Sequence, residues 1–495
     1  MNRCPYAAKA LILGLLVAQV LATVQVYLSN AELFHTLSAV KEAGYLVVPN
    51  ETIMSRLHEF GPAFFGGVFF TFSVGAGLSL LSLSAAWLWD RLLIRNKPSL
   101  TLFLMLWIAW LLVANLPGFC LMVTLYFVAI PLVVFLAALR WMPHGVGERL
   151  SLPTLVHLVP VLLLALLWTS QMDAGLFLAV RDKLFLSNAP GRQINDFYYK
   201  YTLYPAEVFK SLDQKILKTC HIDHLSEESF LPHIERALLN NDYLPLQGDP
   251  RVDMTIAVRD NMLLLGNTGK TILQATLEEF LAAPGATVKK FSQKTDRYPF
   301  FRLFTYYSLL IGLPLILYVF LYTLFRLVLC FFLDERASSM SASILCFLAG
   351  ISLLVLFQHG KGAEIKVEEL AEALESERWQ RRVAALKIVR QKGMDVADFP
   401  AYQTIRSSLH IAERYWLVNA LGASRHPGTY KDILAFLDDP HPNVVCMAFH
   451  ALGQRGETRA VDEIIKRIEI SDHWYEQWYA YKSLRSLGWK QRKSR

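Results

Sequence analysis

Long stretches without a charged side chain dominate the pattern of hydrophobic and polar positions along this chain. A membrane-spanning helix needs about 20 apolar residues to cross a hydrocarbon layer of about 30 Å. One uncharged stretch, 98–139, is too long for a single crossing, and its segment 115–118 (Asn-Leu-Pro-Gly) is typical of a turn. The pattern therefore predicts seven membrane-spanning helices, at about 9–28, 63–89, 99–116, 119–139, 153–170, 303–326 and 341–358.

Two stretches, 171–300 and 362–495, are as charged as ordinary soluble domains and are predicted to lie outside the membrane. In the first, apolar runs on both sides of the segment 259–261 (Arg-Asp-Asn) are typical of a β-hairpin. The hydrophobic spacing around this hairpin predicts three helices, near 205–216, 226–240 and 273–282. We therefore expect a small mixed α/β domain in 171–300, and two further membrane helices in 301–358.

The last part of the chain repeats itself at intervals of 32, 31 and 32 residues. This register aligns four equivalent positions, Arg382, Arg414, Val445 and Gln477. Another apolar helix precedes each aligned helix, and three units end in a helix-stopping glycine, namely Gly393, Gly456 and Gly488. A single helix pair cannot bury its apolar face, so units of this kind stack into a solenoid. The spacing predicts about four helix pairs in 362–495.

The third unit has the clearest signature, from Leu437 to Val445 (Leu-Asp-Asp-Pro-His-Pro-Asn-Val-Val). It resembles HEAT-like repeats of the phycobilisome-lyase type, and the resemblance extends over about 130 residues. That family usually has an arginine after the first valine, where Val445 stands here, whereas Arg382 and Arg414 fit the pattern. The resemblance implies a superhelix of the ARM/HEAT kind and a surface for protein partners. It implies no bilin lyase activity.

Composition narrows the class of protein further. The chain has 495 residues, of which 54% are hydrophobic and 18% charged, against about 25% charged in ordinary soluble proteins. A simple soluble enzyme and a disordered or fibrous chain are both excluded. The net charge is +7, but no region is basic enough to predict nucleic-acid binding. We expect a mainly α fold: a polytopic membrane helix bundle of about seven spans, a small α/β extramembrane domain and a C-terminal α/α HEAT-like solenoid.

The Lys and Arg residues of the short loops predict the orientation, because cytoplasmic loops are enriched in them. With a cytoplasmic N-terminus, the inside loops hold nine such residues and the outside short loops hold two, Lys41 and Arg56. Seven crossings then put 171–300 and 362–495 on the periplasmic side of a bacterial inner membrane. Residues 1–22 also fit a signal peptide, but the apolar run continues to Leu28, which favours an uncleaved anchor.

Few positions in the sequence suggest chemistry. The segment 265–271 ends like a phosphate-binding loop, but that loop requires glycine where Leu264 stands, so we expect a turn there and no nucleotide. The cysteines and histidines lack metal-ligand spacing, and neither a metal nor a cofactor is predicted. His157 lies in a predicted span, where we expect it to bond to a neighbouring helix or lie near the interface; a proton relay or a metal ligand is the alternative.

The leading interpretation is a non-enzymatic membrane scaffold or assembly protein, whose helices contact membrane lipids and whose HEAT-like domain binds a protein partner. Trp and Tyr are frequent in binding hot spots, so candidates for a partner surface, with core packing as the alternative, are Trp474, Trp478 and Tyr481. A transporter or channel is the second interpretation, although no charged side chain lies in mid-span. A membrane-bound transferase or hydrolase is the third, with the candidate residues Asp90, His144 and Asp173.

Overall fold

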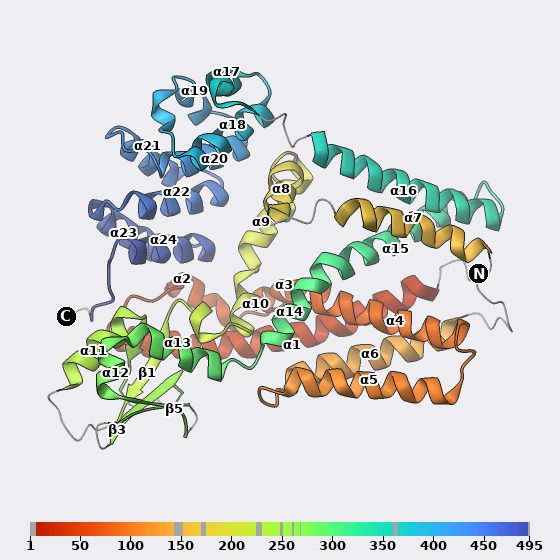
Figure 1. Ribbon diagram of the computed structural model, residues 1–495, viewed down its shortest axis with the longest axis horizontal. Helices are drawn as coiled ribbons and strands as arrows, with labels where there is room; N and C mark the ends of the chain where they lie inside the picture. Colours follow the sequence, from red (N-terminus) through yellow and green to blue (C-terminus); the bar gives the residue numbers. More distant parts are fainter. Residues whose placement is uncertain are drawn as a thin grey trace.

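The chain is mainly helical, with long apolar helices gathered in one bundle and two other parts at one end of that bundle (Figure 1). This computed structural model describes residues 6–142, 152–169, 175–223, 230–247, 251–259, 262–267, 269–359 and 365–493. A five-stranded sheet forms the first of these two parts, and stacked helix pairs form the second.

Within the described residues, six helical segments are long and apolar enough to cross a membrane. Two of them contain a π-helical turn. In the first, α3 (Phe60–Phe70) passes through η2 (Thr71–Gly75) into α4 (Ala76–Arg91). In the second, α14 (Pro299–Tyr307) passes through η6 (Ser308–Gly312) into α15 (Leu313–Leu329). The other four are α1 (Tyr6–Glu42), α5 (Lys97–Asn115), α6 (Leu121–Trp141) and α16 (Glu335–His359).

These six segments coincide with six of the seven predicted spans. The remaining prediction, 153–170, coincides with α7 (Leu152–Thr169). The fully described part of that helix, Val159–Thr169, is apolar but too short for a crossing by itself. The prediction of a turn near 115–118 is confirmed, since α5 and α6 form a hairpin around Gly118.

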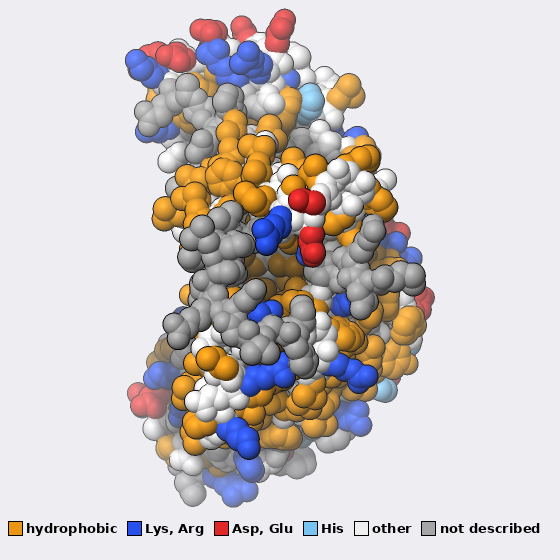
Figure 2. Space-filling view, turned by 90° about the vertical axis from the view of Figure 1, so that its right-hand side faces the viewer, with side chains coloured by type: hydrophobic (Ala, Val, Ile, Leu, Met, Phe, Trp, Pro, Cys, Tyr) orange, Lys and Arg blue, Asp and Glu red, His pale blue; other side chains and the backbone are white. Residues whose placement is uncertain are grey.

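The ends of the long helices separate into two groups. The N-terminus and the α4–α5 and α15–α16 connections lie at one end of the bundle, and the sheet and the helix pairs lie at the other (Figure 1). At the N-terminal end, Lys and Arg side chains are more frequent over the helix ends than Asp and Glu (Figure 2). Four exposed examples are Arg95, Lys97, Arg140 and Arg336.

Small residues let the long apolar helices approach closely, a packing that is common in membrane-spanning helices. A Cβ atom on Gly14 of α1 would clash with Ser79 of α4, and one on Gly77 would clash with Ser308 of η6. The two π-helical turns, η2 and η6, contact one another beside this second crossing. Such turns are often found at functional sites, because they widen the helix locally.

The polar side chain of Gln19 in α1 is satisfied within the bundle. Its amide nitrogen donates to the Phe64 carbonyl oxygen at 2.9 Å and to Thr23 Oγ1 at 3.1 Å. Its amide oxygen accepts a hydrogen bond from Thr71 Oγ1 at 2.7 Å. Gln19 therefore links α1 to the start of η2, and its amide has a structural role within the bundle.

The middle domain contains a mixed sheet with the strand order β2-β1-β3-β4-β5. Its strands are β1 (Lys218–Ile222), β2 (Tyr243–Pro245), β3 (Met254–Arg259), β4 (Met262–Asn267) and β5 (Lys270–Thr276). Strand β1 pairs in parallel with β2 and β3, and β3, β4 and β5 are antiparallel. The predicted hairpin is confirmed, with Arg259 opposite Met262, and Gly269 (φ +77°) lies between β4 and β5.

Helices α11 (Leu231–Asn240), α12 (Leu277–Ala282) and α13 (Pro284–Thr295) accompany the sheet, and two helix predictions are partly wrong. The helix predicted at 205–216 ends with α10 (Leu203–Val208), because the Phe209 ring packs on Phe301 at 4.0 Å and a capping box starts η4 (Leu212–Gln214). The helix predicted at 273–282 begins only at Leu277, because the residues before it form β5.

The C-terminal domain consists of four helix pairs, as the repeat spacing predicts. The first helices are α17 (Leu370–Glu375), α19 (Tyr402–Arg406), α21 (Thr429–Ala435) and α23 (Val461–Ile470). The second helices are α18 (Trp379–Lys392), α20 (Ile411–Leu421), α22 (Pro442–Arg455) and α24 (Trp474–Ser486). Three units end in a left-handed glycine, with φ of 68°, 74° and 79° at Gly393, Gly456 and Gly488.

Equivalent side chains perform the same task in three of the four units. Arg382, Arg414 and Gln477 each donate to the backbone carbonyl six residues earlier, which anchors the loop between the two helices of their unit. The two arginines also pair with a carboxylate of the following unit, Glu413 and Asp439 respectively. Gln477 is uncharged and cannot form such an ion pair. Instead, its amide oxygen accepts a hydrogen bond from a residue outside the repeats.

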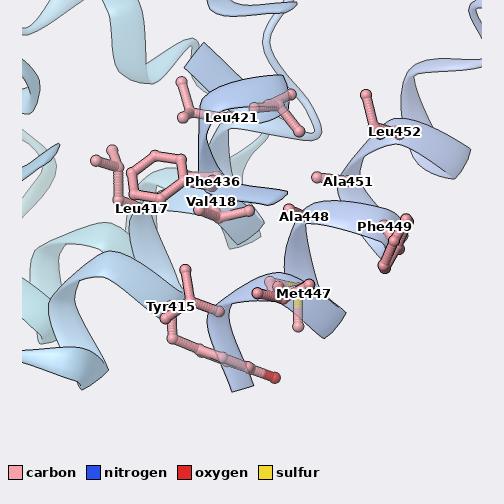
Figure 3. Close-up of a cluster of buried hydrophobic side chains, with 14 of the residues drawn as sticks. Tyr415, Leu417, Val418, Leu421, Phe436, Met447, Ala448, Phe449, Ala451 and Leu452 are labelled. Atoms are coloured by element: carbon pink, nitrogen blue, oxygen red, sulfur yellow. The ribbon is translucent and has the colours of Figure 1, made fainter. Parts of the chain in front are cut away.

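A continuous apolar core runs through the stacked pairs. Side chains from α20 and α22 point toward one another around Phe436, and Leu452 is 1% exposed in this core (Figure 3). By contrast, Leu409, which lies between α19 and α20, is 93% exposed.

These two leucines give a matched pair of variants. Leu452→Ala removes buried methyl groups and leaves a cavity, so we expect it to destabilise the repeat domain by about 2–5 kcal/mol. Leu409→Ala should change stability by less than about 0.5 kcal/mol. Thermal unfolding of the full chain in mild detergent, followed by limited proteolysis, measures both changes. An equal effect of the two substitutions would contradict the described core.

Candidate functional site

The repeat domain is docked through its second helices on the bundle of long apolar helices, which is called the membrane region because these helices are long and apolar enough to cross a membrane. Val48, which follows α1, and Leu186, which precedes α9 (Ala189–Tyr201), are buried in the core cluster of the repeats. In return, Trp474 at the start of α24 is buried in the cluster that holds the membrane helices together. The two cores therefore share residues, and the domains form a continuous packed structure.

Asn50 is the most extensively bonded residue of this docking contact. It is 6% exposed, and its side-chain amide nitrogen lies 2.9 Å from each of three carbonyl oxygens at the end of α23, those of Ile468, Glu469 and Ser471. Its backbone N–H donates to the amide oxygen of Gln477 at 2.8 Å. Asn50 also accepts a hydrogen bond from Ile53 and thereby caps α2 (Glu51–Met54).

A buried carboxylate makes the second contact. Asp182, in the π-helical turn η3 (Arg181–Phe185), is 2% exposed and accepts hydrogen bonds from Lys387 Nζ at 3.0 Å and Trp416 Nε1 at 2.8 Å. The neighbouring Arg181 pairs with it at 2.7 Å and lies 3.8 Å above the Tyr415 ring. Helices α18 and α20 are thus held by a charged group that has no contact with bulk water.

Helix α9 connects the two regions and has two different faces. On one face, Asn195 bonds to Asn443 of α22 at 2.7 Å, and the Tyr199 ring lies 4.7 Å from Tyr475 of α24. Away from this contact, Ile194 is 55% exposed. Helix α9 runs across the direction of the long helices at the end of the bundle that holds the repeats (Figure 1).

The three aromatic residues singled out from the sequence lie in this junction. Trp474 is 5% exposed and packs edge-on against Tyr204 of α10 at 5.0 Å. Tyr481 is 1% exposed, and its hydroxyl donates to Asp242 at 2.9 Å. Trp478 is partly buried and lies under Lys482. All three therefore contact the chain's own residues, and their role in binding a partner stays a prediction.

A cavity of about 1360 Å³ opens beside these residues. Its lining comes from the membrane helices α3 and α14, from α10 and the start of the sheet domain, and from α22 and α24 of the repeats. Six basic side chains line it, namely Lys210, Lys215, Lys218, Arg302, Lys482 and Arg485, together with two acidic ones, Asp213 and Asp242. Basic side chains therefore outnumber acidic ones in the lining itself.

Most of these charges already have partners. Lys215 pairs with Asp253 at 2.7 Å, and Arg485 pairs with Asp242 at 3.0 Å. Burial raises the pKa of the Asp242 carboxyl, and the Arg485 guanidinium opposes that shift. Sequence reasoning did not find this cluster, because its members come from four separate segments and have no recognisable spacing.

The other predicted residues are not brought together. Asp90 lies at the end of α4 and pairs with Arg95 at 2.7 Å, as an ordinary ion pair. His157 lies on α7, but its side chain is outside the described part of the chain, as are His144 and Asp173. Across the described residues, no group of three or more His, Cys, Asp or Glu side chains is arranged to hold a metal ion.

Comparison with known proteins identifies one region. Residues 400–485 match the family model of HEAT repeats, which covers three of the four helix pairs described above. The match is to HEAT repeats in general and does not distinguish the phycobilisome-lyase type. No curated protein and no solved structure matches the chain.

His473, the residue before α24, makes the docking contact sensitive to pH. Burial lowers its pKa to about 4, and Lys200 adds to this shift, while Asp472 and Asp196 oppose it. An unfolded histidine titrates near 6.5. Between these two pKa values the unfolded chain binds a proton that the folded chain does not, so His473 makes stability fall as the pH falls from about 6.5 to about 4.

We therefore expect the His473→Gln variant to lose less stability than the unchanged protein between pH 7 and pH 5, by about 1–2 kcal/mol. Thermal unfolding in detergent at the two pH values measures this difference. Burial raises the pKa of nearby Glu476 to about 6, which acts in the opposite direction in both proteins and cancels in the comparison. Equal losses in the two proteins would contradict the expected role of His473.

Proposed function

We propose that this protein is an integral membrane scaffold that holds a HEAT-repeat surface in a fixed position for a protein partner. HEAT repeats suggest a protein-interaction region, and the long apolar helices are candidates to cross a membrane by their composition. The observation that carries the proposal is the buried docking of the second helices on the membrane region. It supports a fixed position for the repeats, and it leaves their first helices α17, α19, α21 and α23 on the side away from α9 (Figure 1).

The first helices have the surface that such a role requires. Their exposed positions carry both signs of charge and neutral polar groups, for example Glu372, Gln403, Lys431 and Lys466. Since the repeats cannot swing freely, a partner would meet a preorganised surface, which reduces the entropy lost on binding. A partner that used Trp474 or Tyr481 would first have to displace α10 or Asp242, so we assign the partner contact to the first helices.

The proposed orientation has a cytoplasmic N-terminus, with the sheet domain and the repeats on the periplasmic side of a bacterial inner membrane. It is supported by the excess of Lys and Arg at the N-terminal end of the bundle (Figure 2), since cytoplasmic ends of membrane helices are enriched in these residues. Both extramembrane parts lie at the opposite end, which agrees with seven crossings (Figure 1).

Photo-cross-linking tests the proposed surface. With p-benzoylphenylalanine in place of Lys466 or Gln403, we expect irradiation of intact membranes to yield the same discrete adduct from both positions. The same group in place of exposed Lys97, at the other end of the bundle, is the control and should yield no such adduct. Failure of both first-helix positions to form a common adduct would refute the proposed surface.

Reporter fusions test the orientation separately. Alkaline phosphatase is active only outside the cytoplasm, so we expect activity when it is fused after residue 300 or residue 495. Green fluorescent protein fused after residue 96 should fluoresce, because this loop is assigned to the cytoplasm. Phosphatase that is active after residue 96 but inactive after residue 495 would reverse the assigned orientation.

A further inference from the structure

The cavity at the junction has an apolar end and a basic end, and neither end is required by the scaffold function. We propose that it binds one anionic membrane phospholipid, with the phosphate group at Lys482 and Lys210 and the acyl chains between α3 and α14. This inference does not depend on a protein partner.

The apolar end lies part-way along two helical segments that are long and apolar enough to cross a membrane. It is lined by Phe69 and Phe70 at the end of α3 and by Leu309 in η6. Phe70 is the eleventh residue of α3, and Leu309 is the eleventh residue counted from the start of α14. With a rise of 1.5 Å per residue, each lies about 15 Å along its helix, which is about half the thickness of the hydrocarbon layer.

The floor of the cavity is aromatic. The rings of Phe209 and Phe301 lie 4.0 Å apart, and the Phe70 ring lies 5.2 Å from Phe209. The π-helical turns η2 and η6 meet next to this cluster and set the spacing between the two membrane helices. A small hydrophilic anion would leave this apolar end unfilled, whereas acyl chains would contact it along its length.

The basic end lies under the repeats. Lys482 of α24 has its ammonium nitrogen 3.5 Å from the centre of the Trp478 ring. No carboxylate lies within ion-pair distance of Lys482 among the described residues, whereas Lys210 pairs with Glu207. Burial lowers the pKa of Lys482, and the positive charge of Lys210 lowers it further. A phosphate group between the two lysines would relieve their repulsion.

The size of the cavity also favours a lipid. Its volume of about 1360 Å³ exceeds the range of about 300–1000 Å³ that is common for small-molecule sites. The cavity combines an aromatic floor with the lysines Lys482 and Lys210, so a ligand with one anionic head and long chains matches it better than a soluble anion of similar charge. The ligand class is therefore a membrane phospholipid and not a free phosphate.

Native mass spectrometry of the full chain in mild detergent tests this inference with palmitoyl-oleoyl phosphatidylglycerol as the probe. We expect one tightly retained lipid per protein. Lys482→Ala should weaken its binding about tenfold, and Lys466→Ala, a matched substitution at an exposed lysine of α23, should not change it. Leu309→Trp, which fills the apolar end, should also weaken binding without touching the charged end.

Two further probes identify what is recognised. Phosphatidylcholine with the same chains should bind more weakly than phosphatidylglycerol, and glycerol 3-phosphate, which has no chains, should not compete. Equal loss of lipid from the Lys482→Ala and Lys466→Ala variants would overturn the proposal, as would full competition by glycerol 3-phosphate. An unchanged melting temperature of each variant excludes misfolding as the cause of lost binding.

Discussion

Asp182 and Asn50 are polar side chains buried in the contact between the repeats and the membrane region. A buried carboxylate or amide must find its partners within the protein, since water cannot supply them there. The partners of Asp182 are Lys387 and Trp416, and those of Asn50 are the carbonyl oxygens at the end of α23. If the repeat domain slid or rotated, these buried groups would lose their hydrogen-bond partners. The domain therefore has one defined position on the bundle.

The apolar residues of the same contact could tolerate many arrangements, because the hydrophobic effect has no direction. Val48 is buried in the repeat core and Trp474 in the membrane core. These contacts bury apolar surface, but they do not fix the angle between the repeat domain and the bundle. Hydrogen bonds through Gln477 and Asp182 then select the angle. The cavity depends on the angle between the two regions. Its basic end contains Lys482 from the repeats, whereas its apolar end is lined by the membrane helices.

Periodic features could be predicted from the sequence, and contacts between distant segments could not. The apolar runs predicted six long apolar helices, and the 31–32-residue spacing predicted the four helix pairs, three of which stop at Gly393, Gly456 and Gly488. The parallel pairing of β1 with β2 and β3 was missed, because each strand is short and non-local partners decide the pairing. Asn50 has no local signal at all, since all its docking partners are more than 400 residues away.

Asn50 and Gln477 are 427 residues apart in the chain, so they are synthesised at different times. At a synthesis rate of about 5–20 residues per second, the loop after α1 emerges about 20–85 s before the helix that will cover it. During that interval Asn50 lacks the carbonyl oxygens at the end of α23, and Tyr199 and Tyr204 lack the aromatic rings of α24. The docking contact can therefore form only after the last helix pair has been synthesised.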